Sequence, residues 1–180
     1  YELYVKSEDA KKIYELLVNK GKDFNLSNCG MHAMDIMRME SGFLHWGHDI
    51  SPEENQYQAG LSFTISSKKE HEFIGKKALE KIKKEKIKSR FAMFTLKDSK
   101  PGEPLLLHDE PIYLENKIIG RSTSGNYSFN FRKNLTFGYI NNDISNDELH
   151  KKDLFIEVEK KKYPIDVINK PLKQTNFKNN

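Results

Sequence analysis

The spacing of apolar residues divides the chain into two parts of different character. Up to about residue 87, apolar positions recur over long stretches at the spacing of one helix face. Beyond that point, short apolar runs alternate with turn residues, which is typical of strands in a small antiparallel barrel. We therefore expect an α+β region in residues 1–86, followed by a small antiparallel β-barrel in residues 87–180.

Three stretches of the first part are predicted to be helices. Ser7 could cap the first helix, which would end near Gly21. The second would run from Cys29 to about Ser41, and because apolar residues nearly encircle it, we expect most of it to be buried. The third would span roughly residues 70–86, where apolar residues again form a stripe.

Two shorter elements are also predicted in this part. Tyr1–Val5 has the aromatic and β-branched content of a strand. Ser51 followed by Pro52 is typical of a helix start, because proline is favoured at the first helical position after a capping serine.

The second part is predicted to consist of short strands with little helix. Its hydroxyl-rich stretch Ser122–Gly125 lacks the surroundings of a nucleophilic serine and favours a turn or a β-bulge. The predicted strands are Arg90–Leu96, Leu105–His108, Pro111–Leu114, Lys117–Ser124, Leu135–Ile140, Leu154–Val158 and Tyr163–Ile168.

Length and composition favour a folded domain that does not cross a membrane. The 180 residues can bury a core, and eleven Phe with eight Tyr argue against disorder. No stretch approaches the ~20 apolar residues of a membrane-spanning helix, and the start does not resemble a signal peptide. The single cysteine, Cys29, leaves no internal disulfide to be formed.

The net charge of +4 comes from lysine runs, with only four arginines in the chain. Nucleic-acid binding usually shows arginines and interleaved aromatic residues on one basic face. We therefore expect a solvated lysine-rich surface and no nucleic-acid partner, although a basic rim would also suit a polyanionic ligand.

The second predicted helix carries two charges, Arg38 and Glu40, among its apolar residues. A buried charge without a partner is costly, so both side chains must have partners elsewhere in the fold. Glu2 is a further acid, among the aromatic residues of the first predicted strand. It could be an exposed strand residue or an acceptor for the N–H edge of a guanidine-like ligand.

The loop after this helix, His45–Ile50, carries the only tryptophan of the chain, Trp46. His45, His48 and Asp49 are of the types that ligate zinc or iron. Neighbouring ligands on one loop are a weak signal, so we predict no metal site. We favour a hydrogen-bonded loop that packs and orients the tryptophan. The chain also lacks any Gly-x-Gly sequence, and with it a flavin or nicotinamide fingerprint.

Motifs along the whole chain point to one family. Residues 37–42 are Met-Arg-Met-Glu-Ser-Gly, and residues 45–50 are His-Trp-Gly-His-Asp-Ile. They resemble the Leu-Arg-Leu-Glu-x-Gly helix and a dehydrogenase-type loop of the tetrahydrofolate-binding region shared by glycine-cleavage aminomethyltransferases and dimethylglycine and sarcosine dehydrogenases. Further matching stretches are Tyr1–Val5, Gln58–Leu61, Phe73–Leu79, Ile119–Gly125 and Gly138–Ile140.

The resemblance implies four cofactor-binding residues. Glu2 is at the position of the glutamate that hydrogen-bonds the pterin ring, and Trp46 is on the adjoining loop. Phe177 is where aminomethyltransferases have a tyrosine near the ligand, so a hydroxyl is missing here. Arg38 is a family arginine that could contact the ligand or form an ion pair with Glu40 or a neighbouring strand.

Two departures from the family pattern matter. Met34 replaces an arginine of the aminomethyltransferases, which resembles the dehydrogenase branch. The catalytic aspartate of the family lies earlier in the domain than this chain begins. The resemblance therefore implies no catalytic residue here, and a fragment that would be inactive by itself.

The expected function is the tetrahydrofolate-binding region of a dimethylglycine- or sarcosine-dehydrogenase-like enzyme. Such an enzyme would transfer a one-carbon unit from an N-methylated glycine to tetrahydrofolate, with FAD in a separate upstream domain. The alternatives are the aminomethyltransferase of glycine cleavage, with its carrier protein as partner, and a non-catalytic folate-binding module. The resemblance implies a cytoplasmic location, or the mitochondrial matrix in a eukaryote.

Overall fold

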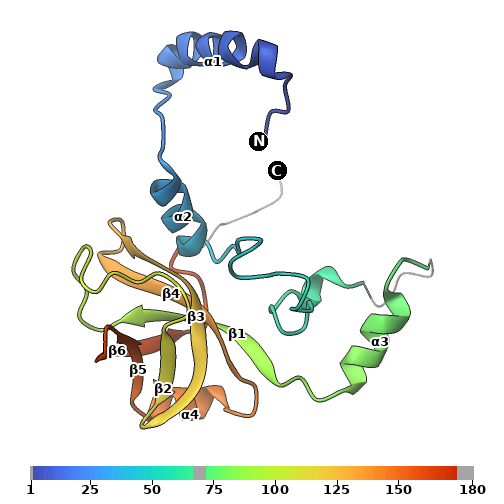
Figure 1. Cartoon of the computed structure of the whole chain (residues 1–180), viewed down its shortest axis with the longest axis vertical. Helices are drawn as coiled ribbons and strands as arrows, with labels where there is room; N and C mark the ends of the chain where they lie inside the picture. Colours follow the sequence, from blue (N-terminus) through green and yellow to red (C-terminus); the bar gives the residue numbers. More distant parts are fainter. Residues whose placement is uncertain (1, 67–71, 174–180) are drawn as a thin grey trace. The chain divides into compact units, whose positions relative to one another are not determined.

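The computed structural model describes residues 2–66 and 72–173 of the chain (Figure 1). Contacts between residues divide the chain into two compact units, Tyr1–Ala33 and Met34–Asn180. Each unit is described by itself. The domain boundary predicted between residues 86 and 87 is based on the change in the spacing of apolar residues, and it stays a prediction.

The first unit contains α1 (Ser7–Gly21) and a short 3₁₀ helix, η1 (Lys22–Phe24). The end of α1 at Gly21 is as predicted, but its N-cap is Lys6, without a side-chain cap, and not Ser7. None of the residues of α1 is buried. The strand predicted at the start is wrong for the described residues 2–5, which have no strand partner to supply ladder hydrogen bonds.

Helix α2 (Met31–Glu40) confirms the predicted second helix, one or two residues shorter at each end. It ends at a left-handed glycine, Gly42, with φ of +75°. A Cβ at Gly42 would also lie 2.6 Å from Pro171, so both the positive φ and the close contact with Pro171 require glycine at this turn. The expectation that most of α2 is buried is wrong, because only Met39 and Glu40 are buried.

The stretch between α2 and the barrel is mostly turns, with a 3₁₀ helix η2 (Ser62–Thr64) and α3 (Lys76–Lys84). The helix predicted to begin at Ser51 is absent, and residues 52–54 form a turn in which the amide and hydroxyl of Ser51 donate to the carboxylate of Glu54. The third helix was predicted over residues 70–86, of which 70–71 lie outside the described residues. Within residues 72–86 the helix is Lys76–Lys84, and Gly75, with φ of +90°, places its start after residues 73–74, which the prediction had included.

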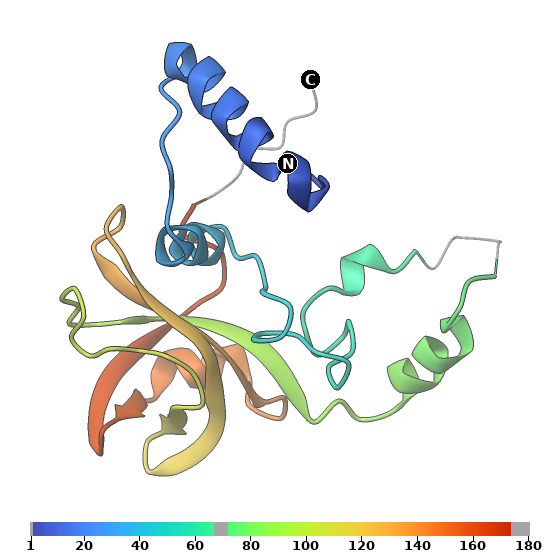
Figure 2. The same ribbon diagram turned by 45° about the horizontal axis from the view of Figure 1, so that its top comes forward.

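Six strands form a closed antiparallel barrel in the order β1-β4-β3-β2-β5-β6, as Figures 1 and 2 show. The predicted architecture of helices followed by a small antiparallel barrel is therefore confirmed. The strands are β1 (Ser89–Leu96), β2 (Pro111–Leu114), β3 (Lys117–Ser128), β4 (Lys133–Asn141), β5 (Leu154–Val158) and β6 (Lys161–Ile168).

Two details of the second part differ from the prediction. Residues 105–108 form no strand, and a helix was missed, α4 (Asn146–Lys151), whose first turn is capped by Ser145. The bulge favoured for Ser122–Gly125 is confirmed, because the register between β3 and β4 shifts between Ser122 and Ser124. This bulge turns hydroxyl groups of β3 toward α2 and its loop, as described below.

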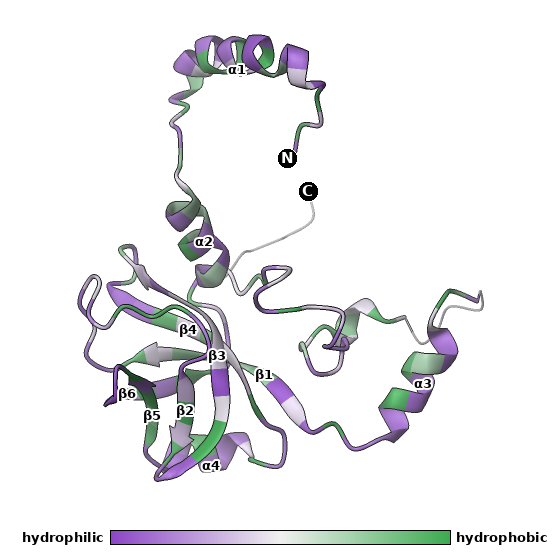
Figure 3. Cartoon of the chain, viewed as in Figure 1, coloured by the Kyte–Doolittle hydropathy of each residue, from purple (hydrophilic) through white to green (hydrophobic). Residues whose placement is uncertain are grey.

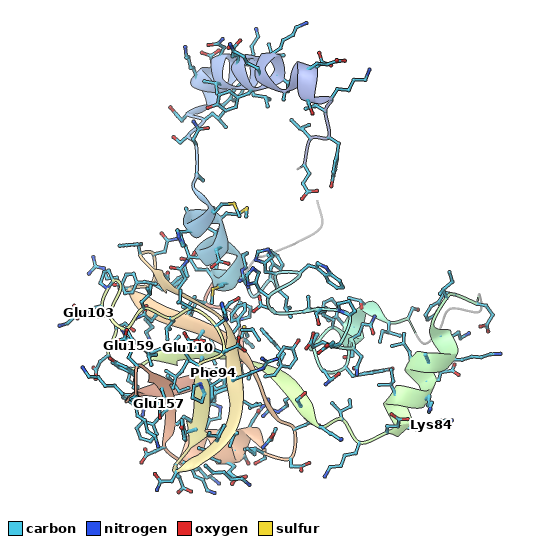
Figure 4. The ribbon with its side chains drawn as sticks, in the orientation of Figure 1. Lys84, Phe94, Glu103, Glu110, Glu157 and Glu159 are labelled. Atoms are coloured by element: carbon cyan, nitrogen blue, oxygen red, sulfur yellow. The ribbon has the colours of Figure 1, made fainter. Side chains whose placement is uncertain are left out.

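The barrel interior holds the main hydrophobic core. Phe94, Ile112 and Ile156 are fully buried, and Figure 4 labels Phe94 inside the barrel. Figure 3 shows apolar residues in the strands of the barrel, and burial alternates along β2, as expected where one face of a strand is turned to the core. A second core cluster joins α2 to the outer face of β4 through Met39 and Phe137.

Candidate functional site

The histidine loop, which we define as His45–Ile50, is folded by its own backbone. The amide of Asp49 donates to the carbonyl of His45 (2.9 Å), and that of Gly47 donates to the carbonyl of Ile50 (2.8 Å). Gly47 has a φ of +89°, and Trp46 and Ile50 form an isolated β-bridge. These backbone bonds make the loop a compact turn, and its side chains extend outward from that turn.

Asp49 is the buried residue of the histidine loop, with a side chain that is fully inaccessible. One carboxylate oxygen, Oδ2, accepts from Nη1 of Arg38 and from the amide of His45 (2.9 Å). The other oxygen, Oδ1, accepts from the hydroxyl of Thr123 (2.5 Å). The backbone carbonyl of Asp49 accepts from the hydroxyl of Tyr139 (2.8 Å). The loop is therefore tied to α2, β3 and β4.

Arg38 is the centre of this network on the side of α2. Its Nε donates to Asp35 (2.9 Å), its Nη2 to the hydroxyl of Ser124 (2.7 Å), and its Nη1 to the carbonyl of Phe43 (3.2 Å) as well as to Asp49. Its guanidinium also lies 5.4 Å from the centre of the Phe137 ring. An ion pair with Glu40 or a neighbouring strand was the expected structural role of Arg38, but its ion pairs are with Asp35 of α2 and Asp49 of the loop, and β3 contributes only the Ser124 hydroxyl.

Glu40, two residues further along α2, faces the β3–β4 turn. Its buried carboxylate accepts from the hydroxyl of Ser128 (2.6 Å). Both of its oxygens also accept from the side-chain Nδ2 of Asn130 (3.0 and 3.1 Å). Its backbone carbonyl accepts from the amide of Lys173 (2.8 Å). Both charges of α2 thus have partners, as their burial requires.

A pocket of about 700 Å³, lined by both polar and apolar residues, lies between the histidine loop and strands β2, β3 and β4. His48, Glu54 and Thr123 line it together with Tyr139. Burial, and then the negative charges of Glu54 and Asp49, raise the pKa of Tyr139 well above its ordinary value. The phenol therefore stays protonated and remains a hydrogen-bond donor to the Asp49 carbonyl.

The wall of this pocket on the barrel side carries an exposed ion pair. Nη1 of Arg121 lies 2.6 Å from Oδ1 of Asp109, and Nδ1 of His108 lies 3.0 Å from Oδ2. The hydrogen bond with His108 and the nearby charge of Arg121 lower the pKa of Asp109, against the opposing effect of burial. The pair thus presents a carboxylate and a guanidinium together at the pocket.

The four residues predicted to bind the cofactor fall in different parts of the structure. Glu2 belongs to the first unit, is exposed, and accepts a hydrogen bond from the hydroxyl of Tyr4 (2.5 Å). Arg38 and Trp46 belong to the second unit, where Asp49 connects the helix of one with the loop of the other. Phe177 lies outside the described residues.

Trp46 differs from the expectation of a packed side chain, because it is 64% exposed. The rings of His45 and His48 lie next to each other instead, tilted by 37° with their centres 4.6 Å apart. The bonds of the loop are made by its backbone and by Asp49, which leaves the indole free of the packing that was predicted. Among residues 2–66 and 72–173, no group of three or more residues could hold a metal ion.

Sequence reasoning missed Thr123 and Tyr139 as partners of the histidine loop. The sequence does single out Asp49, as a candidate metal ligand on a weak signal, and the Ser122–Gly125 stretch, as a turn or a β-bulge. No periodic pattern links positions 74 residues apart, as Thr123 and Asp49 are.

The described part of the chain contains no helix long and apolar enough to cross a membrane.

Both parts of the chain match domain models of known proteins. Residues 1–69 match the GCVT N-terminal domain model, and residues 90–173 match the glycine cleavage T-protein C-terminal barrel domain model. An aminomethyltransferase T structure from Bartonella henselae superposes with a TM-score of 0.76 at 22% identity, covering 91% of this chain and 44% of that protein. This likeness shows the fold.

Curated relatives include dehydrogenases and aminomethyltransferases. Dimethylglycine dehydrogenase of Rattus norvegicus is 34% identical over 96% of this chain. An aminomethyltransferase of Symbiobacterium thermophilum is 32% identical over 78% of this chain. The chain spans 19% of the length of the first relative and 36% of the second.

Proposed function

Because the chain belongs to the glycine cleavage T-protein family, we propose that it forms the tetrahydrofolate-binding region of a dimethylglycine- or sarcosine-dehydrogenase-like enzyme. The observation that carries this proposal is the match to dimethylglycine dehydrogenase along 96% of the chain. The His-Trp-Gly-His-Asp-Ile loop and the methionine at position 34 also favour the dehydrogenase branch. The enzyme would take a one-carbon unit from an N-methylated glycine, and its FAD would be held in another domain.

Two of the predicted residues, each taken within its own unit, have side chains whose chemistry supports a reduced pterin as the ligand. Glu2 has a carboxylate with one described donor, the Tyr4 hydroxyl, so it has lone pairs left to accept N–H groups. Paired N–H donors on a carboxylate form a charge-assisted, bidentate contact. Trp46 offers an exposed indole face for an aromatic ligand. These two side chains are the proposed contacts of the described part, and Phe177 is a third from outside it.

Arg38 has a different proposed role. Its donors are engaged by Asp35, Phe43, Asp49 and Ser124, so it is better suited to fix the site than to bind the ligand. When bound, tetrahydrofolate supplies the amine nitrogens that accept the one-carbon unit. The chain contributes by binding and orienting that cofactor, which raises the rate through proximity.

The test uses protein made from the complete gene that encodes this chain. We expect Glu2→Ala to weaken tetrahydrofolate binding by about 1.5–3 kcal/mol, roughly 10- to 150-fold in Kd, because a hydrogen-bonded charge is removed. Isothermal titration calorimetry measures this change. Glu80→Ala, an exposed glutamate on α3, is the matched control and should bind as the wild type does.

Two outcomes would contradict the proposal. If the wild type binds no tetrahydrofolate, the proposed function is wrong. If Glu2→Ala binds as tightly as Glu80→Ala, the role of Glu2 is wrong. Tetrahydrofolate binding with no turnover of dimethylglycine, sarcosine or an aminomethylated carrier protein would favour a non-catalytic folate-binding module.

The second candidate is the aminomethyltransferase of glycine cleavage. It is favoured by an aminomethyltransferase of Alkaliphilus metalliredigens that is 30% identical over 99% of this chain. Release of ammonia from the aminomethylated carrier protein, with transfer of the methylene carbon to tetrahydrofolate and return of the carrier thiol, would favour this candidate. Oxidation of dimethylglycine or sarcosine with transfer to tetrahydrofolate would favour the dehydrogenase.

A further inference from the structure

The exposed indole of Trp46 lies on a loop whose own bonds do not anchor it to the rest of the fold. The internal hydrogen bonds of the histidine loop run among His45, Gly47, Asp49 and Ile50. A turn closed on itself can still swing as a body about its ends, particularly one with a glycine at positive φ. The direction of the indole therefore depends on what holds the turn from outside.

Asp49 makes the outside contacts of this turn described above. Its carboxylate binds Arg38 of α2 and Thr123 of β3, and its carbonyl accepts from Tyr139 of β4. Three contacts from three elements fix both the position and the rotation of a rigid body, which one or two contacts would not. The Thr123 contact depends on the bulge in β3, which shifts the register at that residue.

We propose that Asp49 is the positioning residue of the proposed folate site, which fixes the histidine loop on the barrel and thereby sets the direction of the Trp46 indole. Asp49 itself touches no ligand, because its buried carboxylate is already occupied by Arg38, Thr123 and the His45 amide. The structural part of this inference stands by itself, and only its link to folate affinity rests on the proposed function.

The charge of Arg38 explains why the anchor is an aspartate. A carboxylate buried beside a guanidinium with further hydrogen bonds is stable, whereas either charge alone would be costly to bury. The Arg38 guanidinium is in turn held by Asp35 and Ser124. The guanidinium that binds Asp49 is thus itself held in place, and a flexible lysine–carboxylate pair would not provide such a fixed partner.

The experiment changes the contact at Thr123, because loss of Asp49 itself could prevent folding. Thr123→Val keeps the shape of the side chain and removes its hydroxyl, and Thr123→Ser restores the hydroxyl. Thr136→Val is the matched control. Thr136 is a buried threonine on β4 whose hydroxyl donates to the Ser124 carbonyl (3.0 Å), and no described hydrogen bond of its side chain reaches the histidine loop.

The first readout is the time-resolved fluorescence anisotropy of Trp46, the only tryptophan of the chain, measured without ligand. The spectrum of Trp46→Phe is subtracted to remove the signal of any other tryptophan in the full protein. We expect a larger amplitude of fast local motion in Thr123→Val, and wild-type behaviour in Thr123→Ser and Thr136→Val. Equal amplitudes in all four proteins would overturn the inference.

The second readout is the Kd for tetrahydrofolate. We expect Thr123→Val to weaken binding about threefold to tenfold, the scale of one hydrogen bond, while Thr136→Val binds normally at a similar loss of thermal stability. If Thr136→Val weakens binding as much as Thr123→Val does, the effect is general destabilisation and the positioning role is wrong. If the wild type binds no tetrahydrofolate, the proposed function is wrong, and the anisotropy result still decides the structural inference.

Discussion

At the scale of single residues, buried polar groups define the site more than apolar ones do. Asp49 and Glu40 are the buried carboxylates of the described residues, and each is matched by donors from the barrel. Every buried side-chain nitrogen or oxygen of the described part has a partner. Such networks are unforgiving, because a single lost member leaves the others without partners.

Tyr139 gives this network a pH dependence. Its pKa is raised above the ordinary value of 10.0, first by burial and then by the charges of Glu54 and Asp49. The unfolded chain binds fewer protons than the folded one above pH 10, so this contribution to stability is complete below that pH and is lost as pH rises.

We therefore expect the stability of the wild type to fall above pH 10 more steeply than that of Tyr139→Phe, which cannot ionise. Urea unfolding at a series of alkaline pH values measures the difference between the two proteins. Well below pH 10 the difference should be constant. A difference that stays constant across the alkaline range as well would contradict the shifted pKa.

At the scale of elements, the approach of β3 to β4 explains where the site forms. The two paired strands approach closely at Gly120, where an added Cβ would lie 2.0 Å from the Tyr139 carbonyl oxygen. Directly beyond this position, β3 bulges at residues 122–124 and turns its hydroxyls toward α2 and the histidine loop. The close contact and the bulge together place Thr123 against Asp49.

Gly120→Ala should therefore destabilise the protein by about 1–3 kcal/mol, because the strands must move apart to admit the methyl group. Chemical denaturation gives the free energy of unfolding. Gly30→Ala is the matched control, since a Cβ there has no heavy atom within 4 Å. Equal stability of the two variants would show that β3 and β4 tolerate the extra atom.

At the scale of the second unit, α2 is the part that connects the barrel with the loop of the proposed site. Arg38 reaches β3 and the histidine loop, Met39 packs on Phe137 of β4, and Glu40 binds the β3–β4 turn. Three consecutive residues of one short helix thus make three kinds of contact with the outer face of the barrel.

We expect Glu40→Ala to lower the free energy of unfolding by about 2–3 kcal/mol, because Ser128 and Asn130 lose their acceptor inside the protein. Urea denaturation measures the loss. The same change at the exposed Glu80 should alter stability by less than ~0.5 kcal/mol. If the two variants unfold alike, the Glu40 network does not hold the helix on the barrel.

The sequence by itself determined the strands of the barrel, because their cores are local apolar runs between turns. Pro111–Leu114 and Leu154–Val158 were predicted at the observed bounds. The same local reasoning overestimated the burial of α2. Apolar residues along a helix indicate which faces could be buried, but they do not indicate whether another element covers those faces. It also missed α4, whose six residues are too short for a periodic signal.

The motifs along the chain, among them those around Arg38 and Trp46, together indicated its family, because each of them is contiguous in the sequence. What those residues touch was decided by the tertiary structure alone. The bond between Thr123 and Asp49 spans 74 positions, and the bond between Ser128 and Glu40 spans 88. Such contacts arise from strand register, a bulge and the crossing of a helix over a barrel, and none of these leaves a local pattern in the chain.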